Sequence, residues 1–471
     1  TPRSLFSMAS TPISQVLNRL YYESGRESEA KVRLGKLMCV SHEEVGNLTI
    51  GDIASSGKLD LVTPIGLRNN LKKIIGDGFK LPSPVHKLKV PAGSPATLRQ
   101  IVVMTRHGAR FPISPFPGNQ NWPGDIPDFW KQYKGTLTPQ GVEDHLRNGS
   151  QLKEYYFDYC KLTDPYGLLS DTCYIRSTNT QRTILSAWSL LLTLFPHGKI
   201  RIQIDGDKTT QKWKDDESST IDDATLTIRV QFDKGKDVTK LKTHKTDEFK
   251  ELHEKNANND PKLNAWANDP WVVKLMDKAY EMTKEPKLAP DLKAIDRIKK
   301  IYKVNTNMTI DEYHNMVTLR NDRNLYLDAK EVLAIKEMAE HCWRLKWTGC
   351  MDDMQVQIAR RGTREAMSLI TKFHDNYVDR KKFPFVYLSN HDGYIAAALS
   401  AMNYKDWQVP GFGCYIIWEL HEISPGRFAI GVRHNPLPRE IPFRHCQLKK
   451  IPSRVTPWDE VEEGMISLEE Y

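Results

Sequence analysis

The chain has 471 residues, a net charge of +8 at pH 7, and 39% hydrophobic and 27% charged residues. This composition is typical of a globular protein and excludes collagen-like, coiled-coil and wholly disordered chains. The sequence contains no run of the roughly 18 apolar residues that a membrane-spanning helix needs, so no transmembrane span is predicted. Its basic residues do not cluster with aromatic ones, and we therefore predict no nucleic-acid partner.

The N-terminal part of the sequence leaves the compartment open. Residues 1–22 contain Arg3, Arg19 and four serines but no acidic residue, which is typical of an organellar, for example mitochondrial, transit segment. A polar N-terminal arm explains the same bias equally well. Three Asn-x-Ser/Thr triplets favour a secretory or lysosomal protein instead. Seven scattered cysteines without a Cys-x-x-Cys pair exclude a zinc ribbon and a disulfide-dense scaffold.

Four prolines separate an N-terminal extension from the rest of the chain. They lie in residues 81–97, which we interpret as an extended linker because proline interrupts helices and central strands. The extension over residues 1–80 carries amphipathic patches that need an apolar surface to cover them. We predict that it docks a protein partner or a second copy of the chain, and we give equal weight to a strap on residues 98–471.

Beyond the linker, β-branched runs alternate with amphipathic segments. Strands are predicted at residues 98–105, 172–176 and 382–389, and helices at residues 183–194, 328–347 and 353–377. Thr138 and Pro139 have the pattern of an N-cap and a first helical position. The polar segment from Asp215 to about Asp260 predicts an excursion with little core. The alternation predicts an α/β fold with a layered sheet core of mainly parallel strands and flanking helices.

Polar groups follow each of the three predicted strands. In chain order they are Arg106, His107 and Arg110, then Arg176, then His391 and Asp392. The carboxyl ends of parallel strands share one edge of a sheet, where α/β folds bind ligands. Singly, each residue has an ordinary interpretation as a loop residue, a surface charge or a helix cap. Together, three arginines and two histidines at one edge need an anion to neutralise them.

These residue types fit phosphoryl transfer. Arginine binds phosphate oxygens with its planar fork, and imidazole is a competent nucleophile toward phosphorus. The attacking imidazole must be neutral, so we expect its other ring nitrogen to donate to a nearby backbone carbonyl. A carboxylic acid such as Asp392 can protonate the leaving alkoxide, and helix N-termini after Gly108 and Gly393 are expected to add N–H donors. This chemistry requires no metal and no cofactor.

The motifs around these residues resemble those of the histidine acid phosphatases. Residues 106–112, Arg-His-Gly-Ala-Arg-Phe-Pro, are similar to the RHGxRxP signature of that family. Arg176-Ser-Thr-Asn with Arg182-Thr resembles its second block, and Ser389-Asn-His-Asp-Gly393 its C-terminal HD motif. Leu137-Thr-Pro-Gln-Gly141 and Trp418-Glu-Leu420 also lie where the family has comparable segments.

The resemblance implies a role for each candidate residue. His107 would be the phosphohistidine nucleophile and Asp392 the proton donor, with a phosphate pocket made of Arg106, Arg110, Arg176 and His391. It also implies that residues 98–471 form one phosphatase-like domain, an α/β core with a mainly helical cap over about 205–377.

The sequence as a whole therefore predicts a metal-independent hydrolase of a small phosphomonoester substrate. A phytase-like or lysophospholipid-directed phosphatase is an alternative within the same fold. A phosphatase-fold subunit with a structural or assembly role, acting through residues 1–80, is an alternative of another class.

Overall fold

The structure is a computed structural model that describes residues 97–122, 127–162, 172–195, 199–205, 225–232, 246–348 and most of 367–449, with 466–467. The predicted extension over residues 1–80 and nearly all of the predicted linker lie outside these residues. The chain divides into two compact units. Among the described residues, a sheet unit contains those within 80–108, 141–244 and 357–471, and a helical unit contains those within 109–140 and 245–356.

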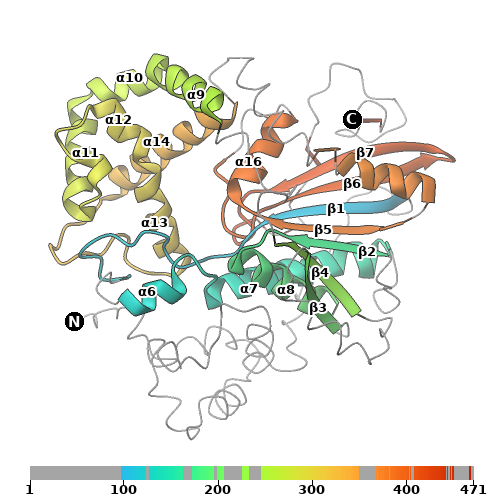
Figure 1. Ribbon diagram of the computed structural model, residues 1–471. Coiled ribbons are helices and arrows are strands. Elements are labelled where there is room, and N and C mark those ends of the chain that lie inside the picture. Colours follow the sequence, from blue (N-terminus) through green and yellow to red (C-terminus); the bar gives the residue numbers. More distant parts are fainter. Residues whose placement is uncertain are drawn as a thin grey trace, which may run out of the picture. The chain divides into compact units, whose positions relative to one another are not determined.

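The described strands of the sheet unit form one sheet in the order β3-β4-β2-β5-β1-β6-β7-β8, with β9 also paired to β7 (Figure 1). Neighbouring strands from β3 to β1 are parallel, and those from β1 onward are antiparallel. The strands are β1 (Leu98–Arg106), β2 (Cys173–Ser177), β3 (Lys199–Asp205), β4 (Thr225–Gln231), β5 (Phe385–Asn390), β6 (Tyr415–Ser424), β7 (Arg427–Asn435), β8 (Leu448–Lys449) and β9 (Ile466–Ser467).

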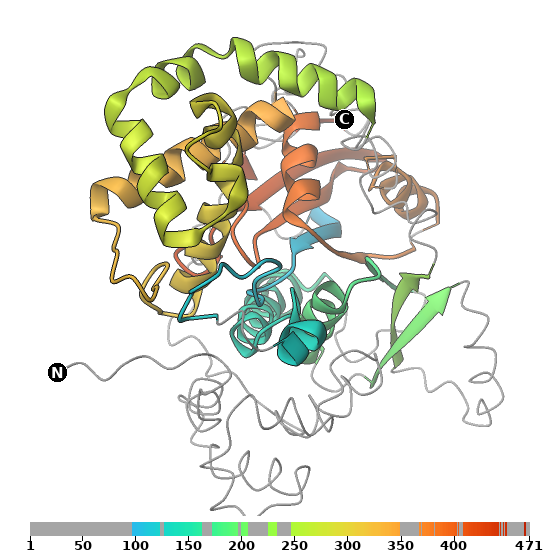
Figure 2. The same cartoon turned by 60° about the vertical axis from the view of Figure 1, so that its left-hand side comes forward.

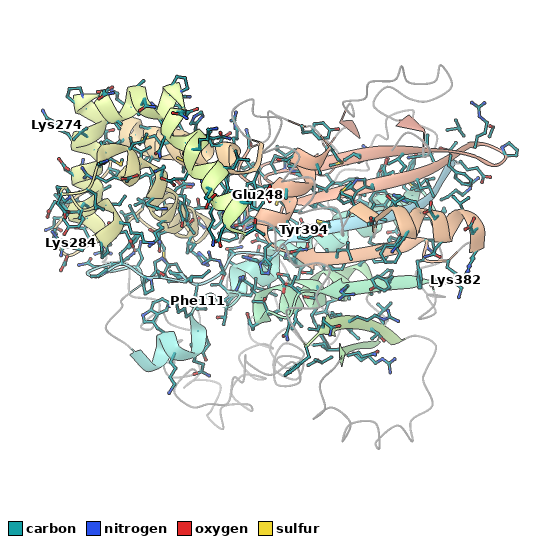
Figure 3. All side chains as sticks on the ribbon, turned by 45° about the horizontal axis from the view of Figure 1, so that its top comes forward. Phe111, Glu248, Lys274, Lys284, Lys382 and Tyr394 are labelled. Atoms are coloured by element: carbon teal, nitrogen blue, oxygen red, sulfur yellow. The ribbon has the colours of Figure 1, made fainter. Side chains whose placement is uncertain are left out.

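The three strands predicted from the sequence are confirmed as the neighbours β2, β5 and β1. All six residues of β5 are buried, as are eight of the nine residues of β1, which is why both strands have continuous apolar runs rather than alternation. Ser389 of β5 pairs with Thr105 of β1 on one side and with Ser177 of β2 on the other. The three strands therefore end side by side, as the position of the polar groups requires. Figure 3 shows Lys382 and Tyr394 near opposite ends of β5.

The polar segment from Asp215 to about Asp260 was predicted to contribute little to the core, and this prediction is wrong for part of it. Residues 225–231 form β4, which lies within the sheet between β3 and β2. Leu226, Ile228 and Val230 alternate along β4 and are buried. The polar and charged residues on either side of β4 conceal this short apolar pattern in the sequence. The antiparallel strands β6 and β7 were likewise not predicted.

Helices of the sheet unit pack closely on the sheet and on one another. They are α7 (Pro139–Leu152), which continues into a π-helix (Lys153–Tyr159), α8 (Gln181–Leu194) and α16 (Asp392–Ala401). The predicted start of α7 at Pro139 is confirmed. Gly149 lets α7 approach α8 closely, because a methyl group there would overlap the carbonyl oxygen of Leu190. The helix α8 packs against β2, β4 and β5, which directs its N-terminus toward the strand ends.

The helical unit, whose helices are drawn in Figure 2, is built around its own apolar core. Its helices are α6 (Pro127–Tyr133), α9 (Asp247–Asn259), α10 (Pro261–Asn268), α11 (Pro270–Thr283), α12 (Ala294–Lys300), α13 (Tyr302–Tyr313) and α14 (Ala329–Thr348), with a 3-10 turn at Pro286–Leu288. The side chains of Asp260 and Asp269 cap α10 and α11, each of which begins with proline. The predicted helix over residues 328–347 is confirmed as α14. The sheet core, flanking helices and helical unit confirm the predicted fold class.

Within the described residues, no helix is both long and apolar enough to cross a bilayer.

One buried polar contact in the sheet unit responds to acid. His374 is fully buried, and its Nδ1 lies 2.7 Å from Oε1 of Gln100 on β1. An amide oxygen only accepts, so Nδ1 carries the proton. Burial lowers the pKa of His374 to about 3.

This shift makes stability depend on pH. Below pH 6.5 the unfolded chain protonates His374 and the folded protein does not, so the free energy of unfolding falls as the pH falls toward 3. We expect His374→Gln to reduce that slope by nearly one proton, about 1.4 kcal/mol per pH unit. Urea unfolding at several values between pH 4 and pH 5.5 measures it, because in that range the unfolded chain is almost fully protonated at His374 and the folded protein is not. Equal slopes in the two proteins would contradict the prediction.

Candidate functional site

The nucleophile predicted from the sequence, His107, lies one residue beyond β1 and is held through its backbone and its ring. Its N–H donates to the carbonyl of Asn390 at 3.0 Å, and its carbonyl accepts from the N–H of Gly413 at 3.1 Å. The ring atom Nδ1 lies 2.9 Å from the carbonyl oxygen of Gly108. Since a carbonyl only accepts, Nδ1 carries the proton and Nε2 carries the lone pair. The expected backbone acceptor is therefore confirmed.

The residues beside His107 are fixed in the same way. Arg106 donates its backbone N–H to the carbonyl of Cys414 at 2.8 Å, and its carbonyl accepts from Nε2 of His145 at 3.1 Å. Burial outweighs that hydrogen bond and lowers the pKa of His145 to about 4, so this ring is neutral at physiological pH. Gly108 donates its N–H to the Ser186 hydroxyl at 3.0 Å.

Gly108 leads into no helix, which corrects one prediction. The next described helix after Gly108 is α6, which begins at Pro127. The N–H of Gly108 already donates to the Ser186 hydroxyl on α8. A methyl group at position 108 would overlap the backbone of Gly141. Glycine is therefore needed here for close packing rather than for a helix start. The helix predicted near Gly393 does exist as α16, which begins at Asp392.

The guanidinium of Arg106 is buried beside His107 and is contacted on several sides. Its Nη1 donates to the carbonyl of Pro410 at 2.5 Å, and its Nη2 lies 2.9 Å from Oδ2 of Asp392. Its Cζ lies 4.2 Å from the ring centre of Phe412. The ring of Phe412 also lies 5.8 Å from that of His107, centre to centre. The segment leading into β6 thus orients both the arginine and the histidine.

His391 and Asp392 follow β5 and face the same place. The His391 ring lies edge-on to the His107 ring, with 5.5 Å between their centres. The Asp392 carboxyl accepts from Arg106 through Oδ2 and from the N–H of Gly393 through Oδ1 at 2.8 Å. The sheet unit therefore brings Arg106, His107, His391 and Asp392 together as the sequence predicted.

Arg182 belongs to this group, although in the sequence it stands out only as part of a motif. Its Nη2 lies 3.5 Å from Nδ1 of His391. Burial lowers the pKa of Arg182 to about 10; the nearby Asp392 carboxylate opposes that shift and Arg106 adds to it. Arg182 lies in the first turn of α8, and the spacing from Arg176 to the start of that helix was the signal that could have identified it.

For the other two predicted arginines, Arg176 and Arg110, the structure shows contacts to residues close to them in the fold. Arg176 is the fourth residue of β2, and its Nη1 lies 3.4 Å from the hydroxyl of Tyr174, which is two residues earlier and so on the same face of the strand. Arg110 belongs to the helical unit, where it is buried, bridges to Leu137 and donates to the carbonyl of Phe111 at 2.9 Å. Their roles in binding phosphate stay predictions.

Comparison with known proteins places this site in a family. The family model of the histidine phosphatase superfamily, branch 2, matches residues 97–406, and the chain belongs to that superfamily. It is 36% identical over 110 residues to prostatic acid phosphatase of Mus musculus, covering 23% of this chain and 27% of that protein. It is 32% identical over 112 residues to lysosomal acid phosphatase of Bos taurus, covering 24% and 25%. The matches thus span about a quarter of these relatives.

Solved structures support the fold. A Hafnia alvei phytase in complex with tartrate is similar with a TM-score of 0.55 at 14% identity, over 81% of this chain and 96% of the phytase. A Citrobacter braakii phytase has a TM-score of 0.53, also at 14% identity, over 79% and 96%. At such low identity these structures establish the shared architecture alone.

Proposed function

We propose that this protein is a phosphoric monoester hydrolase that works through a phosphohistidine on His107. The observation that carries the proposal is the hydrogen bond from Nδ1 of His107 to the carbonyl of Gly108, which keeps the Nε2 lone pair available for attack. Two guanidiniums, from Arg106 and Arg182, and the imidazole of His391 gather beside it. Membership of the histidine phosphatase superfamily and the matches to acid phosphatases support the same activity.

In the first step, Nε2 of His107 attacks phosphorus in line with the ester oxygen. The N–P bond forms as the P–O bond breaks, and the leaving alkoxide takes a proton from Asp392. In the second step, water attacks the phosphohistidine and gives a proton to Asp392, and the N–P bond breaks. Orthophosphate leaves, and both side chains return to their starting states. The guanidiniums stabilise the charge on the equatorial oxygens throughout.

The ion pair between Arg106 and Asp392 has a place in this sequence. In the free site, Nη2 of Arg106 is bonded to Oδ2 of Asp392. An incoming phosphate competes for the same N–H donors and separates the carboxyl from its cation. The carboxylate, now beside the anionic ester, accepts the proton of the monoanionic phosphate ester, and the protonated carboxyl is the form that the first step needs. When orthophosphate leaves, it takes this proton back and the ion pair re-forms. Arg110 and Arg176 keep the phosphate-binding roles predicted for them.

The nucleophile is tested by trapping. We expect His107→Ala to abolish turnover, because Nε2 of His107 is the atom that forms the N–P bond. Brief incubation of the unsubstituted protein with labelled substrate should give an acid-labile phosphoramidate on His107. His253→Gln, which changes a histidine of α9, should keep the label. Label on another residue, or turnover in His107→Ala, would refute the assignment.

The proton donor is tested by varying the leaving group. For an alkyl phosphate, we expect Asp392→Asn to lower kcat by about 10²–10⁴-fold, because the departing alkoxide needs the proton. For 4-nitrophenyl phosphate, whose leaving group departs without protonation, the loss should be much smaller. Asp375→Asn, at an exposed aspartate, is the control. Equal losses for both substrates would mean that Asp392 only orients Arg106.

The two arginines of the second motif are separated by paired substitutions. We expect Arg182→Lys to lower kcat/KM by about tenfold or more, since lysine keeps the charge but cannot form the planar fork. Arg176→Lys measures whether the arginine on β2 also contributes. A large loss in Arg176→Lys with none in Arg182→Lys would show that the residue named by the sequence binds the phosphate.

A further inference from the structure

Two buried hydroxyls form a chain behind His391. Nε2 of His391 lies 3.0 Å from Oγ1 of Thr178, which lies 2.8 Å from Oγ1 of Thr183. Oγ1 of Thr183 lies 2.9 Å from the carbonyl oxygens of both Thr178 and Thr180. Thr178 is 3% exposed and Thr183 is fully buried. The chain therefore connects the pocket imidazole to backbone carbonyls at the start of α8.

The carbonyls decide the direction of every hydrogen bond in this chain. They can only accept, so Thr183 must donate its hydroxyl proton to them. If it donated to Thr178 instead, its oxygen would face two carbonyl oxygens at 2.9 Å with no hydrogen between them. Thr183 therefore accepts from Thr178. The Thr178 hydroxyl has then used its only proton, so it must accept from His391.

We infer that Thr178 and Thr183 are positioning residues that fix the tautomer of His391, with its proton on Nε2. Nδ1 then carries a lone pair toward Nη2 of Arg182, 3.5 Å away. A proton on Nδ1 would instead point at the donors of that guanidinium. This hydroxyl relay, formed by Thr178 and Thr183, thus presents an acceptor to Arg182 and holds the imidazole plane edge-on to His107. The effect of the relay on turnover rests on the proposed function, whereas the tautomer of His391 does not.

The direct test is the tautomer in the free protein. In ¹⁵N-histidine-labelled protein at neutral pH, the two ring nitrogens of His391 have shifts that distinguish Nε2–H from Nδ1–H, and His391→Gln identifies the signals. We expect Nε2–H in the unsubstituted protein. A signal from Nδ1–H would overturn the inference, whether or not the protein hydrolyses phosphate esters.

Substitutions then test the relay. Thr178→Val keeps the shape of the side chain but removes the acceptor, and Thr183→Val frees the Thr178 proton to turn toward His391. Both should replace the single tautomer by a mixture, whereas Thr178→Ser and Thr183→Ser should retain it. Ser189→Ala, which removes a buried hydroxyl that donates within α8, is the matched control. A fixed tautomer in both valine variants would refute the relay.

Activity gives a second measurement. With 4-nitrophenyl phosphate, we expect Thr178→Val to lower kcat/KM by about tenfold, as for the loss of one hydrogen bond, and Thr178→Ser to restore it. Unchanged kcat/KM in Thr178→Val would show that the fixed tautomer is not used in catalysis. If the unsubstituted protein has no phosphatase activity, the proposed function fails, and the tautomer measurement still decides on the relay.

Discussion

The hydrogen bond between the His107 ring and the Gly108 carbonyl is the constraint on which the candidate site depends. It forms because the backbone around His107 is held from two directions. Asn390 approaches from the parallel neighbour β5, and Gly413 and Cys414 approach from the segment that enters the antiparallel neighbour β6. A strand with parallel pairing on one side and antiparallel pairing on the other can be held at one point by two different parts of the chain. The mixed sheet thereby fixes the backbone of His107 at the edge where the polar residues meet.

The candidate site holds more positive than negative charge, and this excess favours an anion as its ligand. Two guanidiniums are largely buried near a single described carboxylate, and the pKa of Arg182 falls because burial penalises its charge. A phosphate dianion would relieve that penalty and accept the N–H donors at once. The uncharged state that we infer for His391 limits the positive charge in the meantime.

The sequence predicted which residues meet at the ends of β1 and β5, and it predicted the fold class, but it missed several strands of the sheet. β1, β2 and β5 were predictable because buried strands have continuous or alternating apolar and β-branched residues in the sequence. Polar residues that follow neighbouring parallel strands then lie at the same edge of the sheet. β4 was missed because its short apolar alternation lies in a polar segment. The sequence pointed to Arg176 rather than Arg182 for the pocket. The motif fixes the spacing of the two arginines, but it does not say that Arg176 lies in a strand and Arg182 in the first turn of a helix. The donors expected from Gly108 were misassigned because Ser186, 78 residues away, already accepts its N–H.

The first turns of α8 carry three separate contacts of the site. Arg182 reaches His391, Thr183 completes the hydroxyl chain, and Ser186 accepts from Gly108. Because a helix advances by about 100° per residue, these positions lie on one face of α8. Inserting or deleting a single residue at the start of this helix would rotate that face away and break all three contacts together. The length of the connection between β2 and α8 is therefore expected to tolerate much less variation during evolution than the identity of the residues on the opposite face of the helix.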